Sequence, residues 1–210
     1  MKISVKIQIA LLIILGAAFI FITVMVLNGL AQNVNEGIYN IIALSISPAL
    51  TALMKIISNI GEWFVYIPFA LFFLIVPGLR IRIGIPAALS LAVAAGLNSV
   101  LKMIFRVDRP ELHRLITETG YGYPSGHAMI GTAFIGVCAY LFYKYTHKKP
   151  AKIAVIVIAC LFLFLIGYSR IYLGVHYPTD VIAGYLCGAM IITICTLVIN
   201  SKVTGRLTAL

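Results

Sequence analysis

Residues 7–27 read IQIALLIILGAAFIFITVMVL, a largely apolar run of 21 residues without a charged side chain. A helix needs about 20 apolar residues to cross the hydrocarbon core of a bilayer, because each residue advances the helix by only about 1.5 Å. The run is longer than the apolar core of a secretory signal peptide, and no small-residue cleavage site follows it. We therefore expect residues 7–28 to form a retained membrane-spanning helix.

Five further stretches of similar character follow along the chain. Of all residues, 62% are hydrophobic and 10% are charged, whereas soluble domains have about 45–50% apolar residues. These values predict an all-α fold, a six-helix transmembrane bundle that forms one integral-membrane domain over residues 1–210. The predicted spans are 7–28, 61–78, 84–102, 125–143, 153–169 and 178–199.

The segment 38–57 is apolar on average but differs from these spans, because polar residues, a proline and a lysine interrupt it. Such a composition is typical of a segment that lies at the membrane interface or is only partly embedded. We expect it to form an additional helical segment between the first two spans.

The net charge of +10 at first suggests a nucleic-acid partner. The basic residues are scattered between apolar runs, however, and form no long basic face, so we expect no nucleic-acid partner. With six spans and cytoplasmic termini, ten Lys and Arg residues lie inside and six outside. This bias predicts a multi-pass protein of the plasma (cytoplasmic) membrane with both termini cytoplasmic, whereas a seventh span at 38–57 would remove the bias.

Three polar stretches fall at junctions that this topology places together on the outer face. Lys102 and Arg109 lie seven residues apart where one span ends, and Tyr123-Pro-Ser-Gly-His127 opens the next helix. The unpaired backbone N–H groups of a helix start favour an anion. The third stretch places His176 four residues before Asp180.

A histidine next to a carboxylate is a candidate nucleophile. The carboxylate accepts the Nδ1 proton, fixes the tautomer and leaves Nε2 to attack. Taken singly, Lys102 is equally well explained by a lysine that reaches the lipid headgroups, and His127 by a capping or packing role. Ionisable groups at membrane depth are costly, however, and their convergence from three stretches favours a functional site.

Together the three stretches resemble the signature of the type-2 phosphatidate phosphatase family, which reads Lys-x6-Arg-Pro, then Pro-Ser-Gly-His, then Ser-Arg-x5-His-x3-Asp. All eleven fixed positions are present. Thirteen residues separate Pro110 from Pro124, and 41 separate His127 from Ser169. These spacings suit a short outer loop and a helical hairpin.

The resemblance implies a membrane lipid phosphatase in which His176 attacks phosphorus and Asp180 orients it. His127 would protonate the leaving oxygen and then activate water. The implied substrate-binding residues are Lys102, Arg109, Ser125, Gly126 and Arg170. No metal or cofactor is implied, because fixed cations would stabilise the transition state instead. The expected partners are a lipid phosphate and the bilayer, with no obligate protein partner.

Small bacterial members of the family act on phosphatidylglycerophosphate, phosphatidate, diacylglycerol pyrophosphate or undecaprenyl pyrophosphate, and the sequence does not choose among them. Two other functions stay open. A phosphotransferase would pass the phosphoryl group to a lipid or sugar hydroxyl instead of water. A transporter or scaffold would be expected to have polar or broken helices at the bilayer midplane, but these spans are apolar there.

Overall fold

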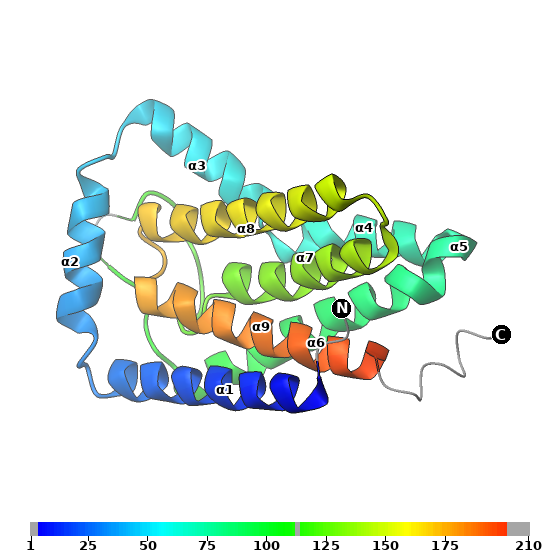
Figure 1. The fold of residues 1–210 in the computed structure, drawn as a ribbon. Helices are drawn as coiled ribbons and strands as arrows, with labels where there is room; N and C mark the ends of the chain where they lie inside the picture. Colours follow the sequence, from blue (N-terminus) through cyan, green and yellow to red (C-terminus); the bar gives the residue numbers. More distant parts are fainter. Residues whose placement is uncertain (1–3, 112–113, 201–210) are drawn as a thin grey trace.

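The computed structural model describes residues 4–111 and 114–200, and every regular element within these ranges is helical. Five long helices lie roughly parallel or antiparallel to one another (Figure 1). They are α1 (Val5–Leu27), α6 (Ile85–Phe105), α7 (Gly126–Tyr145), α8 (Lys149–Tyr172) and α9 (Pro178–Asn200). The predicted all-α transmembrane bundle is confirmed.

Helix α7 forms the centre of the bundle and packs against α6, α8 and α9. Its side chains at Met129, Ala133, Val137 and Leu141 recur every four residues and are completely buried, as expected for one face of a helix. Helix α1 instead lies at the periphery and exposes most of its apolar side chains. Apolar side chains that face outward are favourable when the surrounding solvent is lipid.

The second span differs from the expected continuous helix at 61–78. Helix α4 (Tyr66–Ile75) has only 10 residues, about half of what a bilayer requires. Together with the short 3-10 turn η1 (Trp63–Val65) and helix α3 (Pro48–Ile60), it forms a pair bent by 56°, which counts as a sixth span if it is one broken crossing. The span therefore begins earlier than expected and breaks near Gly61.

The segment expected at the interface is divided between two helices. Helix α2 (Gln32–Ala43) lies across one end of the bundle, nearly perpendicular to α1, α8 and α9 (Figure 1). The side chain of Asn35 donates a hydrogen bond of 2.9 Å to the hydroxyl of Thr179, which attaches α2 to the start of α9. Residues 44–47 connect the two helices, and residues 48–57 belong to α3.

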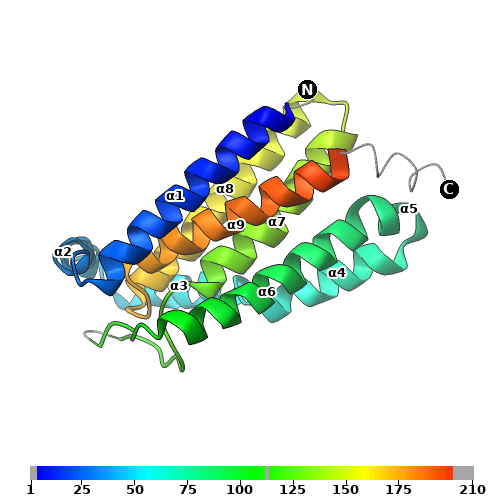
Figure 2. The same cartoon turned by 90° about the horizontal axis from the view of Figure 1, so that it is seen from below.

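A tight turn reverses the chain at the opposite end of the bundle. Helix α5 (Pro77–Leu79) and the π-helical turn η2 (Arg80–Gly84) connect α4 to α6. The start of α1 and the end of α9 lie at this same end, whereas α2 and the loop after α6 lie at the other (Figure 2). Because the start of α1 and the end of α9 lie at the same end, the chain runs the length of the bundle an even number of times between them.

Two glycines allow α9 to approach α7 closely. A Cβ atom on Gly184 would lie 2.6 Å from the carbonyl oxygen of Ser125, and one on Gly188 would lie 2.5 Å from the Cβ of Thr132. Small residues four positions apart are common where membrane helices pack, because apolar burial drives little association in lipid. The contact at Gly184 fixes the backbone at the start of α7.

We expect Gly184→Ala to lower the stability of the protein in detergent by about 1–3 kcal/mol, the usual range for overpacking a close contact. Gly37→Ala is the matched control, because no atom lies within 4 Å of its new methyl group. Thermal unfolding of the two variants gives the comparison. Equal stability of both variants would contradict the proposed close packing.

Candidate active site

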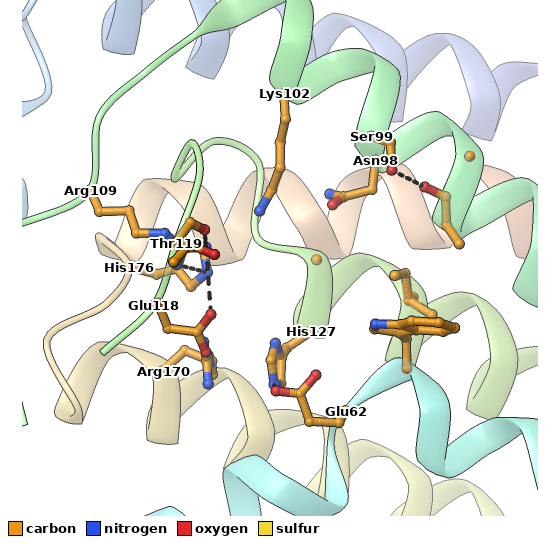
Figure 3. A pocket seen from close by; sticks show the side chains of 15 residues that line it. Glu62, Asn98, Ser99, Lys102, Arg109, Glu118, Thr119, His127, Arg170 and His176 are labelled. Carbon is orange, nitrogen blue, oxygen red and sulfur yellow. Dashed lines mark hydrogen bonds and ion pairs between the residues drawn. The ribbon is translucent and has the colours of Figure 1, made fainter. Parts of the chain in front are cut away.

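The three polar stretches converge on one cavity of about 540 Å³. It lies at the end of the bundle that carries α2, between the last turn of α6, the described residues that join α6 to α7, the start of α7 and the end of α8 (Figure 3). Six of the eight predicted site residues line it: Lys102, Arg109, Gly126, His127, Arg170 and His176. The other two, Ser125 and Asp180, are buried close behind the lining.

His176 lies in the turn between α8 and α9, and its side chain is 1% exposed. Its Nδ1 is 3.3 Å from Asp180 Oδ2, which also accepts a 2.9 Å hydrogen bond from the backbone of Tyr177. Its Nε2 is 3.2 Å from Nη1 of Arg109. Because a guanidinium group only donates, Nε2 carries the lone pair and Nδ1 carries the proton. This is the expected tautomer, but Nε2 contacts Arg109 and is not free.

The surroundings of His176 keep its imidazole neutral. Burial lowers the pKa of His176 well below its ordinary value, and the positive charges of Arg170, Arg109 and Lys102 lower the pKa further. A histidine with a lowered pKa stays unprotonated through the neutral range. Nε2 therefore stays unprotonated, and its lone pair faces Nη1 of Arg109 in this structure.

Both guanidinium groups are held in place by the protein. Arg109 donates to the backbone carbonyls of Gly120, Val175 and Thr119 at 3.0, 3.1 and 3.2 Å. Arg170 is 1% exposed and donates to the hydroxyl of Ser58. Cations that are already oriented lose little entropy when they bind an anion.

Glu118, between α6 and α7, bridges the two arginines. One carboxylate oxygen accepts a hydrogen bond from Arg170, and the other lies 3.8 Å from Nη2 of Arg109 (Figure 3). The carboxylate thus occupies a place that two positive charges make favourable for an anion. Sequence reasoning missed this residue, because a single acid in a polar loop carries no signal.

The start of α7 is held between α6 and α9. The backbone N–H of Ser125 donates to the backbone carbonyl of Asp180 at 3.0 Å, and the amide of Asn98 donates to the carbonyl of Pro124 at 3.1 Å. A Cβ on Gly126 would lie 3.0 Å from Asn98 Oδ1, so a larger residue would crowd this contact. The hydroxyl of Ser125 is buried without a partner among the described residues.

Comparison with known proteins identifies the family. A family model described as the PAP2 superfamily matches residues 83–203. The chain belongs to the PAP2 superfamily. An undecaprenyl-diphosphatase from Sulfolobus acidocaldarius is 34% identical over 168 residues, which cover 76% of this chain and 77% of that protein. Phosphatidylglycerophosphatase B from Bacillus subtilis is 39% identical over 100 residues, which cover 45% of this chain and 47% of that protein.

A solved PAP2 structure has a similar fold. The transmembrane PAP2 type phosphatidylglycerolphosphate phosphatase from Bacillus subtilis superposes with a TM-score of 0.82 at 26% sequence identity. The superposition covers 91% of this chain and 96% of the other.

All eight predicted site residues lie within the part of the chain that the PAP2 model matches. Two residues that contact the predicted site residues lie outside this part of the chain. Ser58, the hydrogen-bond partner of Arg170, and Glu62, whose carboxylate lies 3.2 Å from Nε2 of His127, both precede it. Sequence reasoning missed both, since the position of the α3–α4 break relative to α7 is a tertiary property. Asn98 was also missed, although a polar residue one turn before Lys102 in an apolar span is a usable signal.

Proposed function

We propose that this chain is a membrane lipid phosphatase that hydrolyses phosphomonoester or pyrophosphate headgroups through a phosphohistidine intermediate. The main support is the placement of a neutral His176 imidazole in one cavity with three cationic side chains. An imidazole that faces bound phosphate and is oriented by a carboxylate is a competent nucleophile.

In the first step, Lys102, Arg109 and Arg170 bind the phosphoryl oxygens, and Nε2 of His176 attacks phosphorus. The bond from phosphorus to the lipid oxygen breaks as the new P–N bond forms, and His127 donates a proton to the leaving oxygen. In the second step His127 takes a proton from water, whose oxygen attacks phosphorus. The P–N bond then breaks and inorganic phosphate leaves.

Positive charge replaces a metal ion in this proposal. The transferred phosphoryl group spreads charge over its outer oxygens, and oriented donors in a partly dry site stabilise that charge. Among residues 4–111 and 114–200, no three His, Cys, Asp or Glu side chains are grouped closely enough to share a metal ion.

The shape of the cavity supports sideways entry of a lipid from the bilayer. Its wall on α6 includes the exposed residues Gly96 and Ser99, and Trp63, which also lines it, is 49% exposed. A headgroup that passes between these walls reaches the cations while its tails stay in lipid. The named relatives make an undecaprenyl diphosphate and a phosphatidylglycerophosphate the first substrates to test.

The proposal predicts that His176→Ala lowers phosphate release from these lipids by at least about 10³-fold, since the covalent route is lost with the nucleophile. The assay uses detergent-purified protein in EDTA throughout, and the wild-type protein is expected to stay active there. Glu36→Gln, an exposed change on α2, serves as the matched control. Full activity of His176→Ala, or loss of wild-type activity in EDTA, would exclude this mechanism.

We also propose that the cavity faces the outside of the plasma membrane and that both termini are cytoplasmic, as the lysine and arginine bias supports. In a cysteine-free background, Glu111→Cys in the loop at the cavity end should react with an impermeant maleimide on intact cells. Lys148→Cys, between α7 and α8 at the other end, should react only after the cells are broken. The reverse pattern would place the cavity on the cytoplasmic side.

A further inference from the structure

Glu62 lies at the break between α3 and η1, outside the segment that the family model matches. Its Oε1 is 3.2 Å from Nε2 of His127, and both residues line the cavity (Figure 3). Among the described residues Nε2 has no hydrogen-bond partner, so its contact with Glu62 has the geometry of an ion pair. The site thus contains two carboxylate–imidazole pairs, Asp180 with His176 and Glu62 with His127.

Contacts on both sides of the break hold Glu62 in place. On one side, the hydroxyl of Ser58 binds Arg170, and a Cβ on Gly61 would lie 2.9 Å from Ile166, so α3 ends tightly against α8. On the other side, the ring of Tyr66 stacks on Phe134 of α7 with 5.1 Å between ring centroids. These contacts join the break to α8 and α7, the two helices that carry Arg170 and His127.

A straight helix through this segment would lack the Gly61–Glu62 break. The bend of 56° falls where the polar chain of Glu62 enters the cavity, and a carboxylate in an otherwise apolar span is costly without a partner. Packing alone does not require an acid here. The bend brings the carboxylate of Glu62 next to His127.

We propose that Glu62 is a positioning residue for the general acid–base His127. This inference rests on the proposed phosphatase function and adds a residue to it.

Glu62 holds the ring by Nε2, so that Nδ1 faces the substrate. In the first step Nδ1 gives its proton to the leaving oxygen as the P–O bond breaks. In the second step it takes a proton from water as the new O–P bond forms and the P–N bond to His176 breaks. The charge of Glu62 stabilises the imidazolium that is present before the first step and forms again in the second.

The test compares two lipid phosphates that differ in the leaving group. One is a long-chain alkyl phosphate, whose alkoxide needs a proton to leave. The other is a phosphate ester of a nitrophenol that carries the same chain, whose phenoxide leaves without one. The first-turnover rate is measured for each substrate with the full-length protein in detergent. The ratio of the two rates does not depend on how much of a variant is folded.

We expect Glu62→Gln to raise the ratio of nitrophenyl to alkyl rates by at least about 10-fold over wild type, part of the roughly 10²–10⁴-fold that general acid–base catalysis contributes. On the nitrophenyl ester, phosphoenzyme should accumulate in this variant, because water activation is also slowed. Glu62→Asp, which keeps the charge, should restore most of the wild-type ratio. Glu36→Gln, on α2, should leave both rates unchanged.

An unchanged ratio in Glu62→Gln, whether both rates fall together or neither falls, would overturn the proposal and leave Glu62 with a structural role. That result is distinguishable from failure of the proposed function. In the latter case the wild-type protein would release phosphate from neither ester, or His176→Ala would form the same phosphoenzyme.

Discussion

The burial of positive charge is the physical constraint that shapes the rest of this site. Arg109 and Arg170 are almost completely buried at one end of a bundle whose outer surface is apolar. A buried charge is tolerated only with hydrogen-bond partners, and removing one partner of a buried pair usually costs about 3–5 kcal/mol. The protein provides these partners as backbone carbonyls for Arg109, and as Ser58 and Glu118 for Arg170. The cations are therefore fixed before any substrate arrives.

The helical arrangement follows from this need. Most groups that contact the cations come from places where regular helix stops, namely the segment between α6 and α7 and the turn between α8 and α9, and Ser58 comes from the last turn of α3. The central helix α7 enters the cavity with its first residues, and the close approach of Gly184 and the hydrogen bond from Asn98 hold that start in position. The apolar helix surfaces suit contact with lipid, and the segments where helices end or break carry most of the site residues.

Much of this arrangement was predictable from sequence. Long apolar runs identify α1, α6, α7, α8 and α9, because the thickness of a bilayer sets the length of a span. The predicted topology placed five site residues at the same face of the membrane, and the structure brings them to one cavity. They are Lys102, Arg109, His127, Arg170 and His176.

The missed features depend on tertiary contacts. Hydropathy averages conceal the break at Gly61, so the second span was expected at 61–78 and not as a bent helix that begins at Pro48. The roles of Glu118 and Glu62 depend on the side chains that they contact in the fold, and the sequence does not show these contacts. The contact of Arg109 with Nε2 of His176 was equally invisible in the sequence.

The most direct test of the account is an experimental structure of the protein with vanadate, an anion that adopts the geometry of a phosphoryl group under attack. The proposed mechanism predicts vanadium within bonding distance of Nε2 of His176, with its oxygens contacting Lys102, Arg109 and Arg170 and with Glu118 displaced from between the arginines. Vanadate bound outside this cavity, or bound within it while His176 stays out of reach, would contradict the account.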